Sequence, residues 1–130
     1  MTMHLRRAFL VTRAFYEVLR YELMLCLRGS GSILSGLSRQ VVATKLADPE
    51  MEQAICDAVL LATCLYWKPV LCLQRSVCAV RLLRKYGANA RLMIGYRPAP
   101  FFSHAWVEVD GRVVDGSTGY QKRLMLLHAI

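Results

Sequence analysis

The sequence predicts an α+β domain in which helices come first and a small antiparallel sheet follows. Before Gly87, apolar residues recur every three or four positions, as they do along one face of a helix. After Gly87 they alternate with a period of two, as in a strand. Asp110 and Gly111 then form a pair typical of a two-residue hairpin turn. Helices followed by hairpin strands indicate an α+β fold.

The first expected helix runs from Leu5 to about Leu27. The apolar residues near its three-to-four spacing are Phe9, Leu10, Ala14, Val18, Tyr21 and Leu25. The charged residues expected on its other faces are Arg6, Arg13, Glu17 and Arg20. Residues 29–32 read Gly-Ser-Gly-Ser and predict a break and a hinge. We expect residues 1–47 to be a helical region able to dock a partner, and 48–130 to be the core, within one compact unit.

Two further helices are expected. Asp48, as cap, and Pro49, at the first helical position, mark the start of a helix that runs to about Tyr66. It is apolar almost all round, so we expect it to be buried. Proline at position 69 then disfavours helix before it, and a third helix is expected from Cys72 to Tyr86. Gly87 should close it in the left-handed conformation. The basic residues able to face solvent on this helix are Arg75, Arg81, Arg84 and Lys85.

The strands are expected at Ala90–Tyr96 and Ser103–Val109, with residues 112–115 returning beside the second. If Asp110 and Gly111 are the turn, Trp106 lies opposite Asp115 on one face of the sheet. His104 shares that face because side chains alternate along a strand. Asp115 is therefore expected to be a diagonal neighbour of His104.

Composition narrows the classes of function. Lys and Arg number 17 against 9 Asp and Glu, so the net charge is +8. This charge does not choose among nucleic acid, anionic lipid and acidic peptide. Aromatic and basic residues do not interleave as a base-stacking surface requires, so we expect no nucleic-acid binding. The apolar content is 55%, yet the longest largely apolar stretch, 58–67, is too short to span a bilayer. Peripheral membrane contact through the basic N-terminal half remains open.

The cysteines do not form a metal or disulfide pattern. Their number is odd and no C-x-x-C pair occurs among Cys26, Cys56, Cys64, Cys72 and Cys78. We therefore expect free thiols, no metal, no cofactor and a cytoplasmic location.

Three residues of the second half combine into a site for covalent catalysis. Cys72 lies in the first turn of its helix, where unpaired backbone N–H groups favour a thiolate. Cys78, in mid-helix, lacks this help. His104 is held on a strand, and Asp115 could orient its imidazole. We therefore expect Cys72 to be the nucleophile, His104 the base and Asp115 the orienting residue. The Cys72 N–H would supply part of an oxyanion hole, with Gln74 or Trp67 as candidates for a second donor.

These residues lie in four blocks that resemble one family. The blocks are PVLCLQRS at 69–76, LLRKYG at 82–87, LMIGYR at 92–97 and PFFSHAWVE at 100–108. In this order they resemble the lasso-peptide maturation protease, the protease half of a split B protein. The resemblance is close over residues 66–118 and looser over the N-terminal helices. The segment after Asp115, Gly-Ser-Thr-Gly, departs from the pattern and makes the third residue the least secure.

The resemblance implies a transglutaminase-like, papain-related fold with a Cys-His-Asp triad at Cys72, His104 and Asp115. It implies a leader peptidase that cleaves a ribosomally made precursor peptide in the cytoplasm. A small leader-binding protein would present this substrate, and a lasso cyclase would take the product. Two alternatives stay open at this point. One is a transglutaminase-like acyl transferase, and the other is a non-catalytic adaptor that binds a peptide or a membrane.

Overall fold

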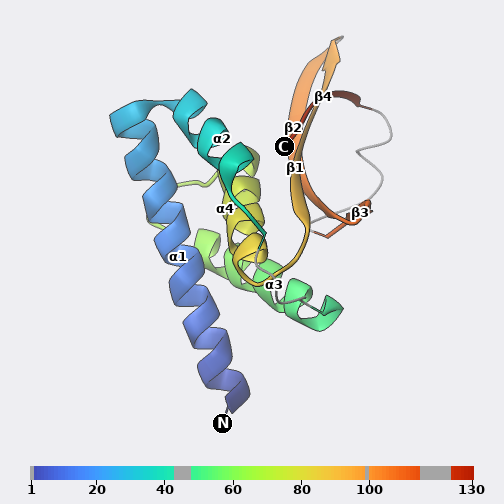
Figure 1. The fold of residues 1–130 in the computed structure, drawn as a ribbon. Coiled ribbons are helices and arrows are strands. Elements are labelled where there is room, and N and C mark those ends of the chain that lie inside the picture. Colours follow the sequence, from blue (N-terminus) through green and yellow to red (C-terminus); the bar gives the residue numbers. More distant parts are fainter. Residues whose placement is uncertain (1, 43–47, 99, 115–123) are drawn as a thin grey trace.

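In the computed structural model, which describes residues 2–42, 48–98, 100–114 and 124–130, helices precede an antiparallel sheet (Figure 1). The helices in these ranges are α1 (Thr2–Arg28), α2 (Ser30–Arg39), α3 (Pro49–Leu65) and α4 (Cys72–Lys85). The strands are β1 (Ala90–Pro98), β2 (Phe101–Val109), β3 (Arg112–Val113) and β4 (Met125–Ala129). The predicted α+β class is confirmed. No helix in the described ranges is both long and apolar enough to cross a membrane.

The break after α1 is shorter than the Gly-Ser-Gly-Ser stretch predicted. Gly29 alone interrupts the helix, with a positive φ of 81° that suits glycine. Helix α2 begins at the next residue. Ile33 and Leu37, four residues apart, are buried on its inner face, and their packing outweighs the low helix propensity of the glycines and serines around them.

Helix α3 starts as its sequence predicts. The Asp48 carboxylate accepts a hydrogen bond from the Met51 N–H at 2.7 Å, and Pro49 is the first helical residue. The expectation that α3 is buried on all sides is wrong. Leu60 and Leu65 are more than half exposed, because α3 packs one face against α1 and α4 and leaves the other open.

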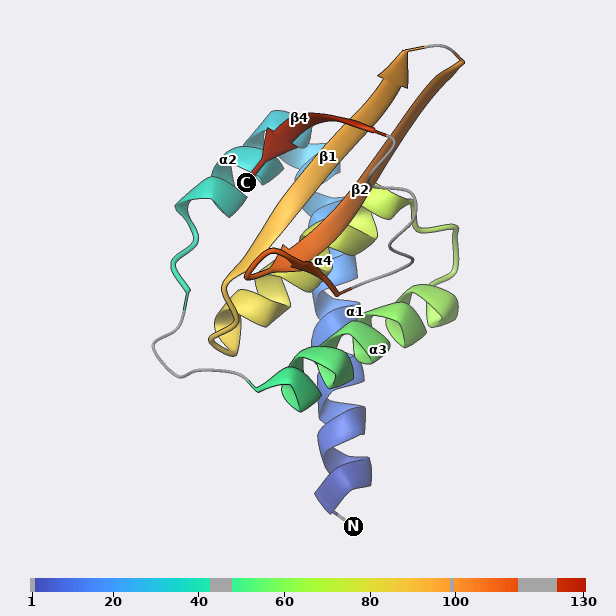
Figure 2. The same cartoon turned by 90° about the vertical axis from the view of Figure 1, so that its right-hand side faces the viewer.

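The sheet has the strand order β3-β2-β1-β4 (Figure 2). The predicted hairpin is confirmed over its described residues. Val109 pairs with Arg112, and both Asp110 and Gly111 have positive φ values, 51° and 82°. The next residues follow the same register, since the Val114 N–H donates to the Val107 carbonyl. Asp115 itself lies outside the described residues. Strand β4, which pairs with β1, was not predicted.

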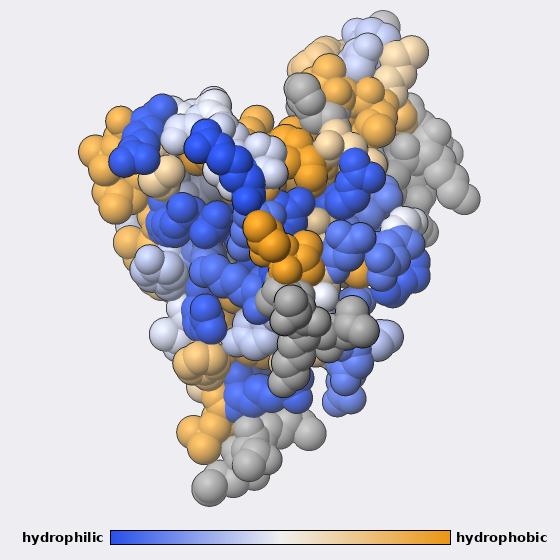
Figure 3. Space-filling view, in the orientation of Figure 1, coloured by the Kyte–Doolittle hydropathy of each residue, from blue (hydrophilic) through white to orange (hydrophobic). Residues whose placement is uncertain are grey.

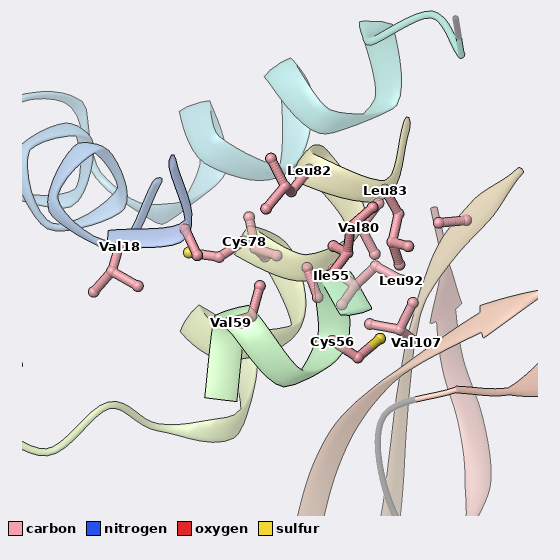
Figure 4. Packing of buried hydrophobic residues seen from close by; sticks show 14 of the residues in the cluster. Val18, Ile55, Cys56, Val59, Cys78, Val80, Leu82, Leu83, Leu92 and Val107 are labelled. Atoms are coloured by element: carbon pink, nitrogen blue, oxygen red, sulfur yellow. The ribbon is translucent and has the colours of Figure 1, made fainter. Parts of the chain in front are cut away.

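Helix α4 occupies the centre of the molecule, between α1 and α3 on one side and the sheet on the other (Figure 1). Figure 4 shows Val18 of α1 near one side of α4, and Leu92 and Val107 of the sheet near its other side. These residues belong to one buried apolar cluster that extends from α1 to the sheet. A helix buried on both sides is fixed in position, so its ends are reliable places for functional groups.

Several charged residues of α1 and α4 are buried, contrary to expectation. Glu17, predicted on an outer face, is only 2% exposed and accepts from Arg81 Nε at 2.9 Å and Lys85 Nζ at 2.6 Å. Arg84, predicted to face solvent, is 7% exposed. Buried charges must be paired or hydrogen-bonded, and these are. The amphipathic pattern could not predict this, because the partners lie far apart in the sequence.

Candidate active site

Cys72 is the first residue of α4, and its side chain is partly buried. The residue before it, Leu71, is the N-cap, with extended backbone and no side-chain capping hydrogen bond. Backbone N–H groups at such a terminus carry a partial positive charge and favour a nearby anion. A thiolate at Cys72, or an oxyanion formed beside it, would be stabilised there.

The contact between α4 and β2 brings this helix start to the strand that carries His104. One turn after Cys72, the Ser76 hydroxyl donates to the Ala105 carbonyl at 3.2 Å. Residues four apart lie on the same side of a helix, so Cys72 and Ser76 both face β2. Ala105 directly follows His104. The structure therefore brings together the two elements that carry Cys72 and His104.

The His104 side chain belongs to an aromatic row on β2. Its ring lies 6.3 Å from that of Phe102 and 6.1 Å from that of Trp106, centroid to centroid. Strand alternation places this row on the opposite face from Ala105 and Val107, which pack into the core. The described contacts therefore join α4 to β2, while the His104 side chain projects from the face of β2 opposite the one that packs on α4. In the described ranges, the chain that returns after the hairpin turn pairs with one edge of β2 from Val109 to Val107.

Burial lowers the pKa of His104 below 6.5, and the positive charge of Arg75 lowers it further. The imidazole is therefore neutral at pH 7 and able to accept a proton. Arg75 was predicted to face solvent, and this prediction is wrong for its Nε atom. Its Nε is buried and has no hydrogen-bond partner within the described residues. The spacing was an available signal, since Arg75 lies three residues after Cys72 on the same side of α4.

A pocket of about 300 Å³ adjoins Arg75 between α3 and α4. Its lining residues are Gln53, Cys56, Asp57, Val59, Leu60, Arg75, Ala79 and Val114. The lining is mostly apolar, with a few polar groups, which is the usual character of a site that accepts a ligand side chain. Arg75 thus lines this pocket with the same side chain whose positive charge lowers the pKa of His104.

The other thiol of α4 differs sharply from Cys72. Cys78 is 1% exposed and packs between α4 and α1 (Figure 4), and burial raises its pKa well above the ordinary thiol value. It is an inert core residue. The Gln74 side chain is also turned toward α1, since its Nε2 donates to the Val18 carbonyl at 3.2 Å. The prediction that Gln74 could be the second oxyanion donor is therefore wrong. Trp67 stacks on Tyr66, with ring centroids 4.1 Å apart.

Comparisons with known proteins agree with this architecture. The model of the transglutaminase-like superfamily matches residues 15–127. The chain is also 37% identical over 59 residues to the microcin J25-processing protein McjB of Escherichia coli. That match covers 45% of this chain and 28% of McjB, so the chain matches less than a third of that relative's length. No solved structure matches the chain. Because the superfamily match extends over most of its 130 residues, this chain belongs to the transglutaminase-like superfamily.

Proposed function

We propose that this protein is a cysteine peptidase that removes the leader from a ribosomally made lasso-peptide precursor. The carrying observation is the Ser76–Ala105 hydrogen bond, which holds the start of α4 against the strand of His104. Membership of the superfamily supports acyl-transfer chemistry at a cysteine. The matched relative is a processing protein for microcin J25 by name, which supports a precursor peptide as substrate.

In the proposed reaction, His104 accepts the Cys72 thiol proton and the thiolate attacks the scissile carbonyl carbon. The N–H groups of the first turn of α4 face the developing oxyanion. When the C–N bond breaks, the imidazolium returns its proton to the departing amine, which is the new N-terminus of the core peptide. The leader remains on Cys72 as a thioester.

Water completes the cycle. His104 takes a proton from water, and the hydroxide displaces the thiolate and frees the leader as a carboxylic acid. Asp115 would hold the imidazole in the required tautomer. The register confirmed up to Val114 supports this role, because its continuation by one residue would bring Asp115 opposite Trp106, beside His104 on the same face.

The proposal includes two partners. A small leader-binding protein presents the precursor, and a lasso cyclase takes the freed core peptide. The pocket beside Arg75 would receive a side chain of the precursor near the cleaved bond. It is lined by residues of α4, and one of them, Arg75, lies close enough for its charge to lower the pKa of His104.

The test is cleavage of a co-expressed precursor, followed by mass spectrometry, with Cys72→Ala compared with Cys64→Ala. Cys64 is an exposed thiol on α3 and provides the same chemical change away from α4. We expect the Cys72 variant to lose at least about a thousandfold in rate and the Cys64 variant to keep its activity. Full cleavage by Cys72→Ala would refute the nucleophile. A product bearing an added amine instead of water would assign the site to acyl transfer.

A further inference from the structure

Helix α1 carries two apolar stripes, and the domain core uses only one of them. The inner stripe, which includes Leu10, Ala14 and Val18, is buried against α3 and α4. The second stripe is exposed, and α1 itself lies at an outer edge of the molecule (Figure 1). Its residues, which we call the outer seam, are Leu5, Phe9, Thr12, Tyr16, Leu19, Leu23 and Cys26, all exposed. Figure 3 shows apolar atoms at the upper and lower parts of this left-hand edge.

The outer seam has the spacing of a coiled-coil face. Successive members are separated by four, three, four, three, four and three residues. This alternation repeats every seven residues and keeps one narrow face toward a neighbouring helix. The exposure is substantial, at 61% for Leu5, 57% for Phe9, 61% for Tyr16 and 60% for Leu23. Exposed apolar side chains in a continuous row are a feature of interaction sites.

Positive charge flanks the outer seam on one side. Arg6, Arg13 and Arg20 each follow a seam residue directly and recur every seven positions, where coiled coils place the charges that choose a partner. Arg13 lies over the Phe9 and Tyr86 rings, 5.6 Å from each centroid, which positions its charge beside the seam without neutralising it.

The two carboxylates of α1 do not balance these arginines. Glu17 is buried and bonded to Arg81 and Lys85, and Glu22 is paired with Lys68 at 2.5 Å. Arg6 turns to α3, where it donates to Met51 Sδ at 3.1 Å and lines a pocket with Glu50 and Asp57. Arg13 and Arg20 have no such carboxylate neighbours among the described contacts, so the surface beside this part of the outer seam is positive and a complementary partner must be acidic.

We propose that the outer seam binds an amphipathic helix of another protein, one whose apolar stripe is flanked by Asp and Glu. A second copy of this chain does not fit. An antiparallel pair of α1 helices would bring the arginine rows together, and a parallel pair would bring them against Ala8 and Phe15. A membrane fits less well, because the seam is narrow and its arginines lie along one side only, whereas interfacial helices have a broad apolar face.

This inference rests on α1 alone and not on the proposed reaction, so its test measures binding and no cleavage. The probe is a synthetic helical peptide with Leu at the two core positions of each heptad and Glu at both flanking positions. A second peptide has Lys in place of every Glu. We expect the acidic peptide to bind the full-length protein at least about tenfold more tightly than the basic one. Arg13→Glu/Arg20→Glu should reverse that preference.

A matched pair of leucines supplies the control. Leu19 and Leu25 are 41% and 42% exposed on the same helix, but only Leu19 belongs to the outer seam. We expect Leu19→Glu to weaken binding of the acidic peptide about tenfold and Leu25→Glu to leave it unchanged, both variants keeping the wild-type circular dichroism. Equal binding of both peptides, or equal losses in the two variants, would overturn the proposal. Failure of the acidic peptide to bind would also overturn the proposal if the protein instead self-associated or bound phosphatidylglycerol vesicles and Leu19→Glu abolished that association.

Discussion

The two ends of α4 are held to different degrees. At its C-terminal end, the Arg84 guanidinium donates to the carbonyls of Ala90, Leu37 and Ile130, at 3.0, 2.5 and 3.1 Å. Gly87, with a φ of 91°, closes the helix by donating to the Arg84 carbonyl. This end therefore joins α2, β1 and the C-terminus into one unit.

The N-terminal end is held by fewer such bonds in the described ranges, since Gln74 and Ser76 donate one each, to carbonyls of α1 and β2. Leu71, the N-cap residue, is 74% exposed, and its side chain makes no capping hydrogen bond. Helix α3, by contrast, has its cap in Asp48. An uncapped start costs stability, but it leaves N–H groups free to bind an anion. The comparison shows that α4 is held most strongly at its C-terminal end, whereas its N-cap residue leaves the backbone donors of the first turn for the proposed chemistry at Cys72.

The largest expected loss of stability comes from breaking the anchored end. Arg84→Met removes three hydrogen bonds to carbonyls, two of them buried and one partly buried, so we expect the free energy of unfolding to fall by about 3–5 kcal/mol in urea titration. Arg91→Met is the matched control. Arg91 is exposed on β1, and its replacement should change stability by less than about 0.5 kcal/mol. Equal effects of the two substitutions would show that the anchor contributes little.

A smaller loss is expected from Glu17→Gln, which leaves the charges of Arg81 and Lys85 without their carboxylate. We expect about 2–3 kcal/mol. Burial by itself would raise the pKa of Glu17, but hydrogen bonds from Lys85 and Arg81 outweigh it and lower the pKa below 4.5. The stabilisation is therefore present above pH 4.5 and lost as the pH falls through the lowered value.

The Glu17 prediction has a control on the same helix. Glu22 pairs with Lys68, whose side chain is 51% exposed, so Glu22→Gln should change stability much less. Urea titrations of both variants between pH 3 and 7 make the comparison. Glu17→Gln should flatten the acid loss of stability, and an unchanged pH profile would contradict the lowered pKa.

The open end should respond in the opposite direction. Leu71→Ser places a hydroxyl where α4 has no side-chain cap, on backbone that is already extended, with φ −78° and ψ 165°. We expect a gain of about 1 kcal/mol in stability. The same hydroxyl competes for the N–H groups that would bind the oxyanion, so precursor cleavage should slow several-fold. A gain in stability with unchanged cleavage would argue against a catalytic role for these donors.

The smallest expected effect concerns pH. Arg75→Gln removes the charge that helps burial to lower the pKa of His104. The pKa then rises, and the acid limb of the cleavage rate moves to higher pH, because His104 must be neutral to accept the thiol proton. Arg97→Gln is the control, since Arg97 lies over the Phe102 ring and is not among the causes of that shift. An acid limb that stays at the same pH in Arg75→Gln would show that the Arg75 charge does not act on His104 during cleavage.

The local pattern of the sequence determined much of this protein. Asp48-Pro49, Gly87 and Asp110-Gly111 place the start of α3, the end of α4 and the hairpin turn, because caps and tight turns depend on nearest neighbours. The same pattern placed Cys72 at a helix start and His104 on a strand. It also predicted the pairing of Val109 with Arg112, since a two-residue turn fixes the register.

Only the tertiary structure decided which charges are internal. Arg84 bonds to carbonyls 6, 46 and 47 residues away, and Glu17 to cations 64 and 68 residues away. No periodicity along one helix contains such partners. The strand β4 and the inward turn of Arg75 depended on the same long-range packing. The sequence thus determines where α3 starts, where α4 starts and ends and where the hairpin turns, whereas burial of a charged or apolar side chain depends on what another part of the chain brings against it.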